Sequence, residues 1–119
     1  MTRINCGIPP AELTDKHLLS EHREIKRIPN AIKKGRYHLT NIPDKFKLGP
    51  GHVKFFYNKL LYLHKRYNEI YQECLLRGFN ITDYNEAFKD LPTDLYSDYS
   101  PSEKDKELIR QRIKERLEK

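Results

Sequence analysis

The sequence predicts an all-α fold, and three observations lead to that prediction. Apolar residues recur every three or four positions in three separate stretches, which is the spacing of one face of an α-helix. No stretch shows a convincing alternation of apolar and polar residues, the pattern of a half-buried strand. The chain of 119 residues is 37% hydrophobic, which suits one modest core. We therefore expect residues 1–119 to form a single compact domain of three helices with irregular loops.

The first helix is expected over residues 13–34. Thr14 or Asp15 can cap its start, and Gly35 is a plausible stop. Pro29 lies inside the helical pattern and predicts a kink or break at that point. The apolar stripe that should face the core consists of Leu18, Ile25, Ile28 and Ile32.

The second helix is expected over residues 53–77 and carries the strongest periodic signal. Gly78 is a natural residue for its end. The stretch Gly49-Pro50-Gly51 precedes it and is either a phosphate-binding helix start or a tight turn, and the turn is the favoured alternative. The apolar positions follow alternating steps of three and four residues: Val53, Phe56, Leu60, Leu63, Tyr67, Ile70 and Cys74.

The third helix is expected to begin at Ser100-Pro101-Ser102-Glu103 and to run to the C-terminus. Serine at the N-cap, proline at the first helical position and glutamate at the third form a capping box. Residues 79–99 are expected to form a long ordered loop. The apolar side of the third helix consists of Leu108, Ile109, Ile113 and Leu117.

The charge of the chain favours a polyanionic partner. Residues 1–80 carry a net charge of +8, and residues 81–119 carry −2. Such an excess attracts nucleic acid, although a basic surface without a partner is an equal alternative from charge alone. No apolar run is long enough to cross a bilayer, and the first ten residues lack the apolar core of a secretory signal. We expect a cytoplasmic protein that is not secreted.

The polar side of the first helix gathers charge in a distinctive way. At 100° per residue, Lys16, His17, Arg23 and Arg27 share one side with a single carboxylate, Glu24. The ordinary alternative is an ion pair of Glu24 with Arg27 on a solvated face. The helical pattern by itself favours that ion pair.

Other polar residues point to structure rather than to chemistry. Glu21 falls on the apolar stripe and is either a buried, hydrogen-bonded carboxylate or the edge of that stripe, so we expect a structural role. The histidines and the two cysteines, Cys6 and Cys74, show no spacing of metal ligands. We therefore expect no metal and no other cofactor, and we expect the thiols to be reduced.

The N-terminus is a candidate nucleophile. Thr2 is a small residue, which permits removal of Met1 and exposes the α-amine of Thr2. An α-amine has a reference pKa of about 7.7–8.0, so a useful fraction is neutral and nucleophilic at pH 7. Nearby cations would increase that fraction, because they disfavour the ammonium form.

Several short blocks occur in order along the chain: Met1-Thr2-Arg3-Ile4-Asn5, His17-Leu18, Arg23-Glu24, Gly51-His52-Val53, Phe55-Phe56-Tyr57, Glu73-Cys74-Leu75 and Arg77-Gly78-Phe79-Asn80-Ile81. In these blocks the chain resembles the pyrimidine-dimer DNA glycosylase/AP lyases of the phage endonuclease V type, which act on ultraviolet-damaged DNA. The resemblance extends from Thr2 to about Arg116.

The resemblance implies a fold and a reaction. The fold has three helices, with an N-terminal segment that threads between them to reach the active site. The α-amine of Thr2 would attack the deoxyribose of the damaged nucleotide, expel the base and form an imine. Glu24 would assist opening of the sugar ring and then take the proton whose loss drives β-elimination.

The resemblance also implies the partner and the residues that bind it. The partner would be double-stranded DNA that contains a damaged base or an abasic site, bound by a monomer. His17 matches an active-site residue of the family, and Lys16 stands where the family has glutamine. The residues expected to bind DNA are Arg3, Lys16, His17, Arg23, Arg27, Arg112 and Arg116.

Two alternatives to this enzyme stay open. One is a basic DNA-binding module without catalysis. The other is a lyase with a different base lesion, because the tyrosine-rich tail linked to dimer recognition in the phage enzyme has no counterpart in this sequence.

Overall fold

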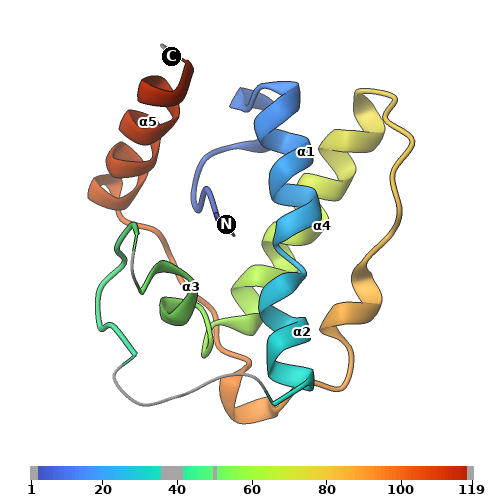
Figure 1. Ribbon diagram of the computed structural model, residues 1–119, viewed down its shortest axis with the longest axis vertical. Coiled ribbons are helices and arrows are strands. Elements are labelled where there is room, and N and C mark those ends of the chain that lie inside the picture. The colour runs from blue at the N-terminus through green and yellow to red at the C-terminus, as the bar shows by residue number, and fades with distance from the viewer. Residues whose placement is uncertain (1–2, 36–41, 50, 118–119) are drawn as a thin grey trace.

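The fold is all-α, as predicted. The computed structural model describes residues 3–35, 42–49 and 51–117, and within these ranges it contains helices and no strand (Figure 1). The α-helices are α1 (Asp15–Glu24), α2 (Arg27–Lys33), α3 (His52–Phe55), α4 (Leu60–Leu76) and α5 (Glu103–Leu117). The described residues also form short 3₁₀ helices: η1 (Pro10–Glu12) before α1, and η2 (Asn85–Phe88) and η3 (Thr93–Leu95) between α4 and α5.

The first predicted helix is divided into α1 and α2. Thr14 caps α1 by accepting a hydrogen bond from the backbone N–H of His17 at 3.3 Å, and Gly35 follows α2 with φ of 69°. The break lies at Ile25 and Lys26 rather than at Pro29, where the sequence suggested it. Proline lacks an N–H and its ring collides with the carbonyl four residues earlier, which here belongs to Ile25. The break therefore precedes the proline by one turn.

The second predicted helix is also divided, into α3 and α4. Residues 56–59 form a turn between them, which the alternating spacing of three and four residues did not indicate. The amine of Lys59 donates to the carbonyl of Phe55 at the end of α3, at 3.0 Å. The turn buries both Phe55 and Phe56, although adjacent residues on one continuous helix point about 100° apart.

The end of α4 is the stop that Gly78 predicted. Gly78 has φ of 79°, the N–H of Phe79 donates to the carbonyl of Cys74 at 3.0 Å, and Gly78 N–H donates to Leu75 at 3.0 Å. This pair of bonds is the Schellman motif, which favours glycine because it requires a positive φ. The predicted loop of residues 79–99 contains η2 and η3.

The capping box of α5 lies two residues later than predicted. The Ser102 hydroxyl accepts from the backbone N–H of Asp105 at 3.1 Å, and the Asp105 carboxylate accepts from the N–H of Ser102 at 3.2 Å. Asp105 is also bound by the Tyr99 hydroxyl. The Ser-x-x-acid pattern occurs twice, at residues 100–103 and at residues 102–105. The acid of the second occurrence, Asp105, is the one that also accepts from Tyr99.

The N-terminal segment runs between α5 on one side and α1 and α4 on the other, as the family resemblance implied (Figure 1). Ile4, Cys6 and Ile8 are buried in the core, together with the apolar faces of α1, α2 and α4. Gly7 adopts φ of 76°, and a Cβ there would lie 2.9 Å from side-chain atoms of Pro101 and Lys106. Glycine thus permits the residues around the start of α5 to pack closely on the segment.

One residue dominates the apolar contact of α5. Ile109 is completely buried, Ile113 is half-buried and Leu108 is 42% exposed, whereas the side chain of Leu117 lies outside the described part of the chain. None of the described helices combines the length and the apolar character that crossing a bilayer requires.

We expect Ile109→Ala to lower the free energy of unfolding by about 2–5 kcal/mol, because it leaves a cavity where α5 meets the core. Leu108→Ala is the control on the same helix, and its effect should stay within about 0.5 kcal/mol. Urea unfolding followed by circular dichroism measures both values. Equal losses in the two variants would contradict this account of how α5 is held.

Candidate active site

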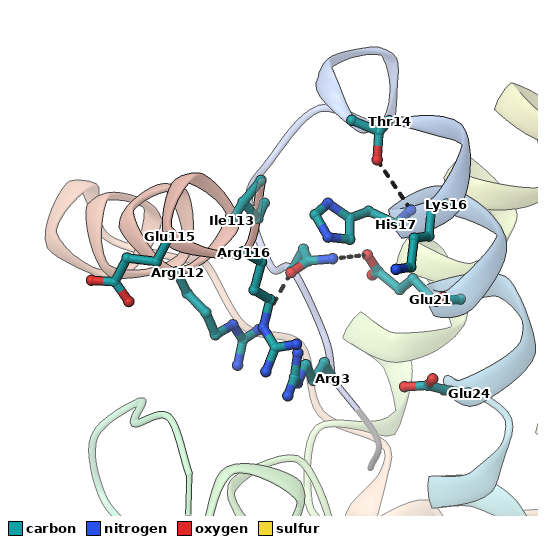
Figure 2. A pocket seen from close by; sticks show the side chains of 12 residues that line it. Arg3, Thr14, Lys16, His17, Glu21, Glu24, Arg112, Ile113, Glu115 and Arg116 are labelled. Atoms are coloured by element: carbon teal, nitrogen blue, oxygen red, sulfur yellow. Dashed lines mark hydrogen bonds between the residues drawn. The ribbon is translucent and has the colours of Figure 1, made fainter. Parts of the chain in front are cut away.

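A cavity of about 850 Å³ opens between the N-terminal segment, α1 and α5 (Figure 2). Its walls are mostly charged and polar, and they come from segments more than 80 residues apart in the sequence. The lining consists of Arg3, Asn5, Thr14, Lys16, His17, Ser20, Glu21, Glu24, Arg112, Ile113, Glu115 and Arg116.

Helical spacing explains how α1 supplies one wall. Lys16, Ser20 and Glu24 are four residues apart, so they lie above one another on the same side of α1. The N-cap bond of Thr14 fixes the first turn of this wall. On α5, Arg112 and Arg116 are likewise four residues apart and face α1 across the cavity (Figure 2).

The cavity places guanidinium groups opposite a carboxylate. Figure 2 shows Arg3, Arg112 and Arg116 pointing toward one another, with Glu24 across from them on α1. The Glu24 side chain is only 14% exposed. A pocket lined by several cations suits phosphate groups, and the carboxylate beside them suits a cation that forms on the substrate.

Arg23 and Arg27 lie outside this lining. Arg23 is 58% exposed, and its Nη2 is 3.7 Å from Oε2 of Glu24, so the ion pair of Glu24 is with Arg23 and not with Arg27 as the helical pattern suggested. Arg27 is exposed at the start of α2. Because the helix breaks after Glu24, the angular step of α1 does not carry over to Arg27.

A buried network ties the walls of the cavity together. Arg66 on α4 donates from Nε to Oε2 of Glu21 at 2.7 Å and from Nη2 to Oε1 at 3.1 Å. Asn5 donates to the same carboxylate at 2.9 Å and accepts from Nη2 of Arg112 at 3.3 Å. Glu21 is thus the buried, hydrogen-bonded carboxylate that was one of its two predicted roles.

Arg66 also holds the N-terminal segment, through a 2.5 Å bond from Nη1 to the carbonyl of Ile8. Burial disfavours its charge, but the Glu21 carboxylate outweighs that effect and raises the pKa of Arg66 above its usual value. Burial lowers the pKa of Arg112 below the usual arginine value, although Glu21 acts in the opposite direction. Hydrogen bonds through Glu21 and Asn5 join the two arginines in one network.

His17 contributes a neutral ring to the cavity. Its Nδ1 is buried and has no hydrogen-bond partner among the described residues. Burial lowers the pKa of His17, and the charges of Lys16 and Arg112 act in the same direction. The ring is therefore uncharged at pH 7, with one ring nitrogen as a donor and the other as an acceptor.

The predicted nucleophile, Thr2, lies outside the described residues, as does Met1. Arg3, the next residue, lines the cavity that contains Glu24. Within the described ranges, no three His, Cys, Asp or Glu side chains gather in a way that would hold a metal ion. The roles of the proposed site residues remain predictions.

Sequence reasoning did not assign roles to four of the residues found at or beside the site. Arg66 carries a weak signal, since it lies about 80° from the centre of the apolar stripe of α4, at the edge of that stripe, where a buried charge would need a partner. Asn5 and His52 carry no such signal in one sequence, because their bonds to Glu21 and Ile4 join distant segments. Glu115 carries none because it reaches the cavity only through the docking of α5.

One comparison with known proteins bears on this cavity. A family model described as pyrimidine dimer DNA glycosylase matches residues 1–86, more than half of the chain. The matched range includes the N-terminal segment and α1 to α4, and therefore Arg3, Glu24 and the wall formed by α1. Helix α5, with Arg112 and Arg116, lies beyond it.

Proposed function

This chain belongs to the pyrimidine dimer DNA glycosylase family, whose members repair damaged DNA, and from that premise we propose that it is a glycosylase with AP lyase activity. The neutral α-amine of Thr2 attacks C1′ of the damaged nucleotide, and the bond from C1′ to the base breaks, so that the base leaves with the bonding electrons and takes up a proton. The attacking nitrogen loses a proton, and the bond from C1′ to the ring oxygen then breaks. The ring oxygen takes up a proton, and a protonated imine joins Thr2 to the deoxyribose. This part of the reaction is the glycosylase step.

The lyase step follows from the same imine. The protonated imine draws electrons from C2′, which makes a proton on C2′ acidic. Glu24 removes that proton, and the bond from C3′ to the phosphate oxygen breaks by β-elimination. The strand is cut on the 3′ side of the lesion, with no metal and no other cofactor in the proposed reaction.

The observation that carries this proposal is the pairing of one partly buried carboxylate with the N-terminal segment in one cavity. Glu24 and Arg3 line the same space, and Thr2 is the residue directly before Arg3. A carboxylate beside the imine stabilises its positive charge, and surroundings with a lower dielectric than water strengthen that effect. The same carboxylate is available as the base.

The cationic residues are proposed to bind the DNA backbone. Arg3, Lys16, Arg112 and Arg116 line the cavity and would hold phosphates near the lesion, and His17 would add one hydrogen bond. The exposed Arg23 and Arg27 would contact phosphates outside it. A single chain is proposed to suffice for one lesion.

Borohydride trapping tests the proposed chemistry. Borohydride reduces an imine to a stable amine, so wild-type protein with Thr2 as its first residue should become covalently linked to DNA that contains an abasic site. Peptide mass analysis should place the link at the α-amine. The matched control is protein that carries an acetylated N-terminus, which should bind the DNA and form no link.

Two results would contradict the proposal. If protein with Thr2 as its first residue bound abasic DNA without forming a covalent link or cutting the strand, the chain would be a DNA-binding module without catalysis. If the link formed at a lysine, the role of Thr2 would be wrong. Parallel reactions with ultraviolet-irradiated and abasic duplexes separate the proposed lesion from a different base lesion.

A further inference from the structure

We propose that His52 is a positioning residue for the N-terminal nucleophile, because its ring anchors the backbone of Ile4, two residues after Thr2. This inference rests on the proposed function, since it assigns a role relative to the α-amine of Thr2. His52 does not line the cavity and would not touch DNA. Its effect would be transmitted through the backbone alone.

Both ring nitrogens of His52 are engaged. The backbone N–H of Ile4 donates to Nε2 at 3.0 Å, and Nδ1 lies 2.9 Å from the carbonyl oxygen of Lys47. A carbonyl oxygen only accepts, so Nδ1 carries the proton and Nε2 is the acceptor. Only the neutral ring with its proton on Nδ1 satisfies both bonds.

The surroundings of His52 favour that neutral form. The residue is only 3% exposed, and this burial lowers its pKa. The carbonyl of Lys47 and the carboxylate of Glu21 act against the decrease, and the positive charge of Arg112 adds to it. The ring is therefore uncharged at neutral pH, as acceptance from Ile4 requires.

Neighbouring rings hold His52 in one orientation. The edge contacts of its ring with Phe46 and Phe56 have centroid separations of 5.5 Å and 5.4 Å, with interplanar angles of 82° and 83°. His52 is the first residue of α3, and Gly51 before it has φ of 89°. A ring confined in this way provides a fixed acceptor, which a mobile surface side chain would not.

Chain geometry makes this anchor relevant to the amine. Two peptide links separate Thr2 from Ile4, and consecutive Cα atoms are about 3.8 Å apart. Fixing the N–H of Ile4 therefore restricts the volume open to a group two residues away. The segment has further anchors at Gly7, whose N–H donates to the Tyr62 hydroxyl at 3.1 Å, and at Ile8, but these lie farther along the chain from Thr2.

Two substitutions separate the two bonds of the ring. In His52→Gln the longer side chain brings its amide oxygen near the position of Nε2, so the bond from Ile4 is retained. In His52→Asn the shorter side chain brings its amide nitrogen near the position of Nδ1, so the Lys47 contact is retained and the Ile4 anchor is lost. Both variants are uncharged and smaller than the original residue.

The experiment measures borohydride trapping on abasic DNA in single turnover, with protein in excess at saturating concentration. We expect His52→Asn to react about 10–10²-fold more slowly, with its DNA dissociation constant changed less than threefold, because misplacement of a reacting group costs rate rather than binding. His52→Gln should react within about threefold of wild type. Tyr62→Phe removes the Gly7 anchor and should leave the trapping rate unchanged.

Amide hydrogen exchange tests the anchor itself. In folded His52→Asn the N–H of Ile4 should exchange at least tenfold faster, while amides of α4 such as Ile70 exchange at the wild-type rate. Unchanged Ile4 exchange, or wild-type trapping with fast Ile4 exchange, would overturn the proposal. Slowing by His52→Gln equal to that by His52→Asn would overturn it as well.

A measurement on unaltered protein does not depend on how the variants fold. The ¹⁵N chemical shifts of the His52 ring should identify the tautomer with its proton on Nδ1, and a proton on Nε2 would overturn the proposal because that nitrogen could not accept from Ile4. If wild-type protein itself forms no link with DNA, the proposed lyase chemistry fails. The tautomer and the Ile4 exchange rate still decide whether His52 anchors the segment.

Discussion

Glu24→Gln is expected to lower the rate of strand cleavage at an abasic site by about 10²–10⁴-fold, the loss typical of removing a positioned general base. Glutamine has nearly the shape of glutamate but neither takes a proton nor carries the negative charge that stabilises a cationic imine. The Glu24 side chain is only 14% exposed, so water has limited room to replace it. Cleavage of an end-labelled abasic duplex in single turnover measures the loss.

Binding should respond in the opposite sense. Removing a negative charge from a cavity lined by arginines does not weaken its attraction for phosphate, so the dissociation constant for abasic DNA should stay the same or decrease. Glu115→Gln is the matched control, since Glu115 lines the same cavity and makes a 3.2 Å contact with Gln111 on its own helix. We expect this control to cut DNA at the wild-type rate. Equal losses in both variants would mean that the charge of the cavity, and not a base at Glu24, matters.

The sequence predicted which residues form helices better than it predicted where the helices break. The burial of Leu18, Leu63 and Ile70 follows the apolar spacing, and the stop at Gly78 follows from its requirement for a positive φ. The steps of three and four residues between apolar positions continue through residues 56–59, so periodicity cannot reveal the turn that lies there. The break before Pro29 was displaced because a proline acts on the carbonyl one turn earlier.

The candidate site was predictable where one helix builds it and where the family resemblance supplied residues. Lys16, His17 and Glu24 share a wall because α1 is regular between Asp15 and Glu24. The helical pattern also placed Arg23 and Arg27 beside them. Arg23 is 58% exposed and pairs with Glu24 from outside the lining, although α1 is regular there. The placement of Arg27 failed because it extended the same angular step across a break.

The opposite wall depends on how distant segments dock. Arg112 is held at the cavity by Asn5, and Asn5 is held by Glu21, so the position of this arginine depends on contacts between residues about 100 positions apart. No local pattern encodes such contacts. The family resemblance supplied Arg112 and Arg116, and the docking of α5 brings them to face α1 (Figure 2).

Arg66→Met is expected to lower the free energy of unfolding by about 3–5 kcal/mol, the typical cost of removing one partner from a buried ion pair. The substitution leaves the Glu21 carboxylate buried with Asn5 as its remaining described donor, and it leaves the carbonyl of Ile8 without the bond from Arg66. Methionine fills much of the volume of the arginine stem, so the loss reports the missing charge and hydrogen bonds. Urea unfolding at pH 7 gives the value.

The adjacent residue provides a control with the same ion-pair distance in a different environment. Lys65 lies 2.7 Å from Asp98 and Arg66 lies 2.7 Å from Glu21, but the side chains of the first pair are 58% and 49% exposed and those of the second are 3% and 1% exposed. Water solvates the charges of the exposed pair whether or not the pair forms, so Lys65→Met should leave the free energy of unfolding nearly unchanged. A comparable decrease in the free energy of unfolding of both variants would show that burial does not determine how much stability is lost with an ion pair. A small loss in Arg66→Met would show that the N-terminal segment keeps its place without Arg66, and that its other anchors suffice.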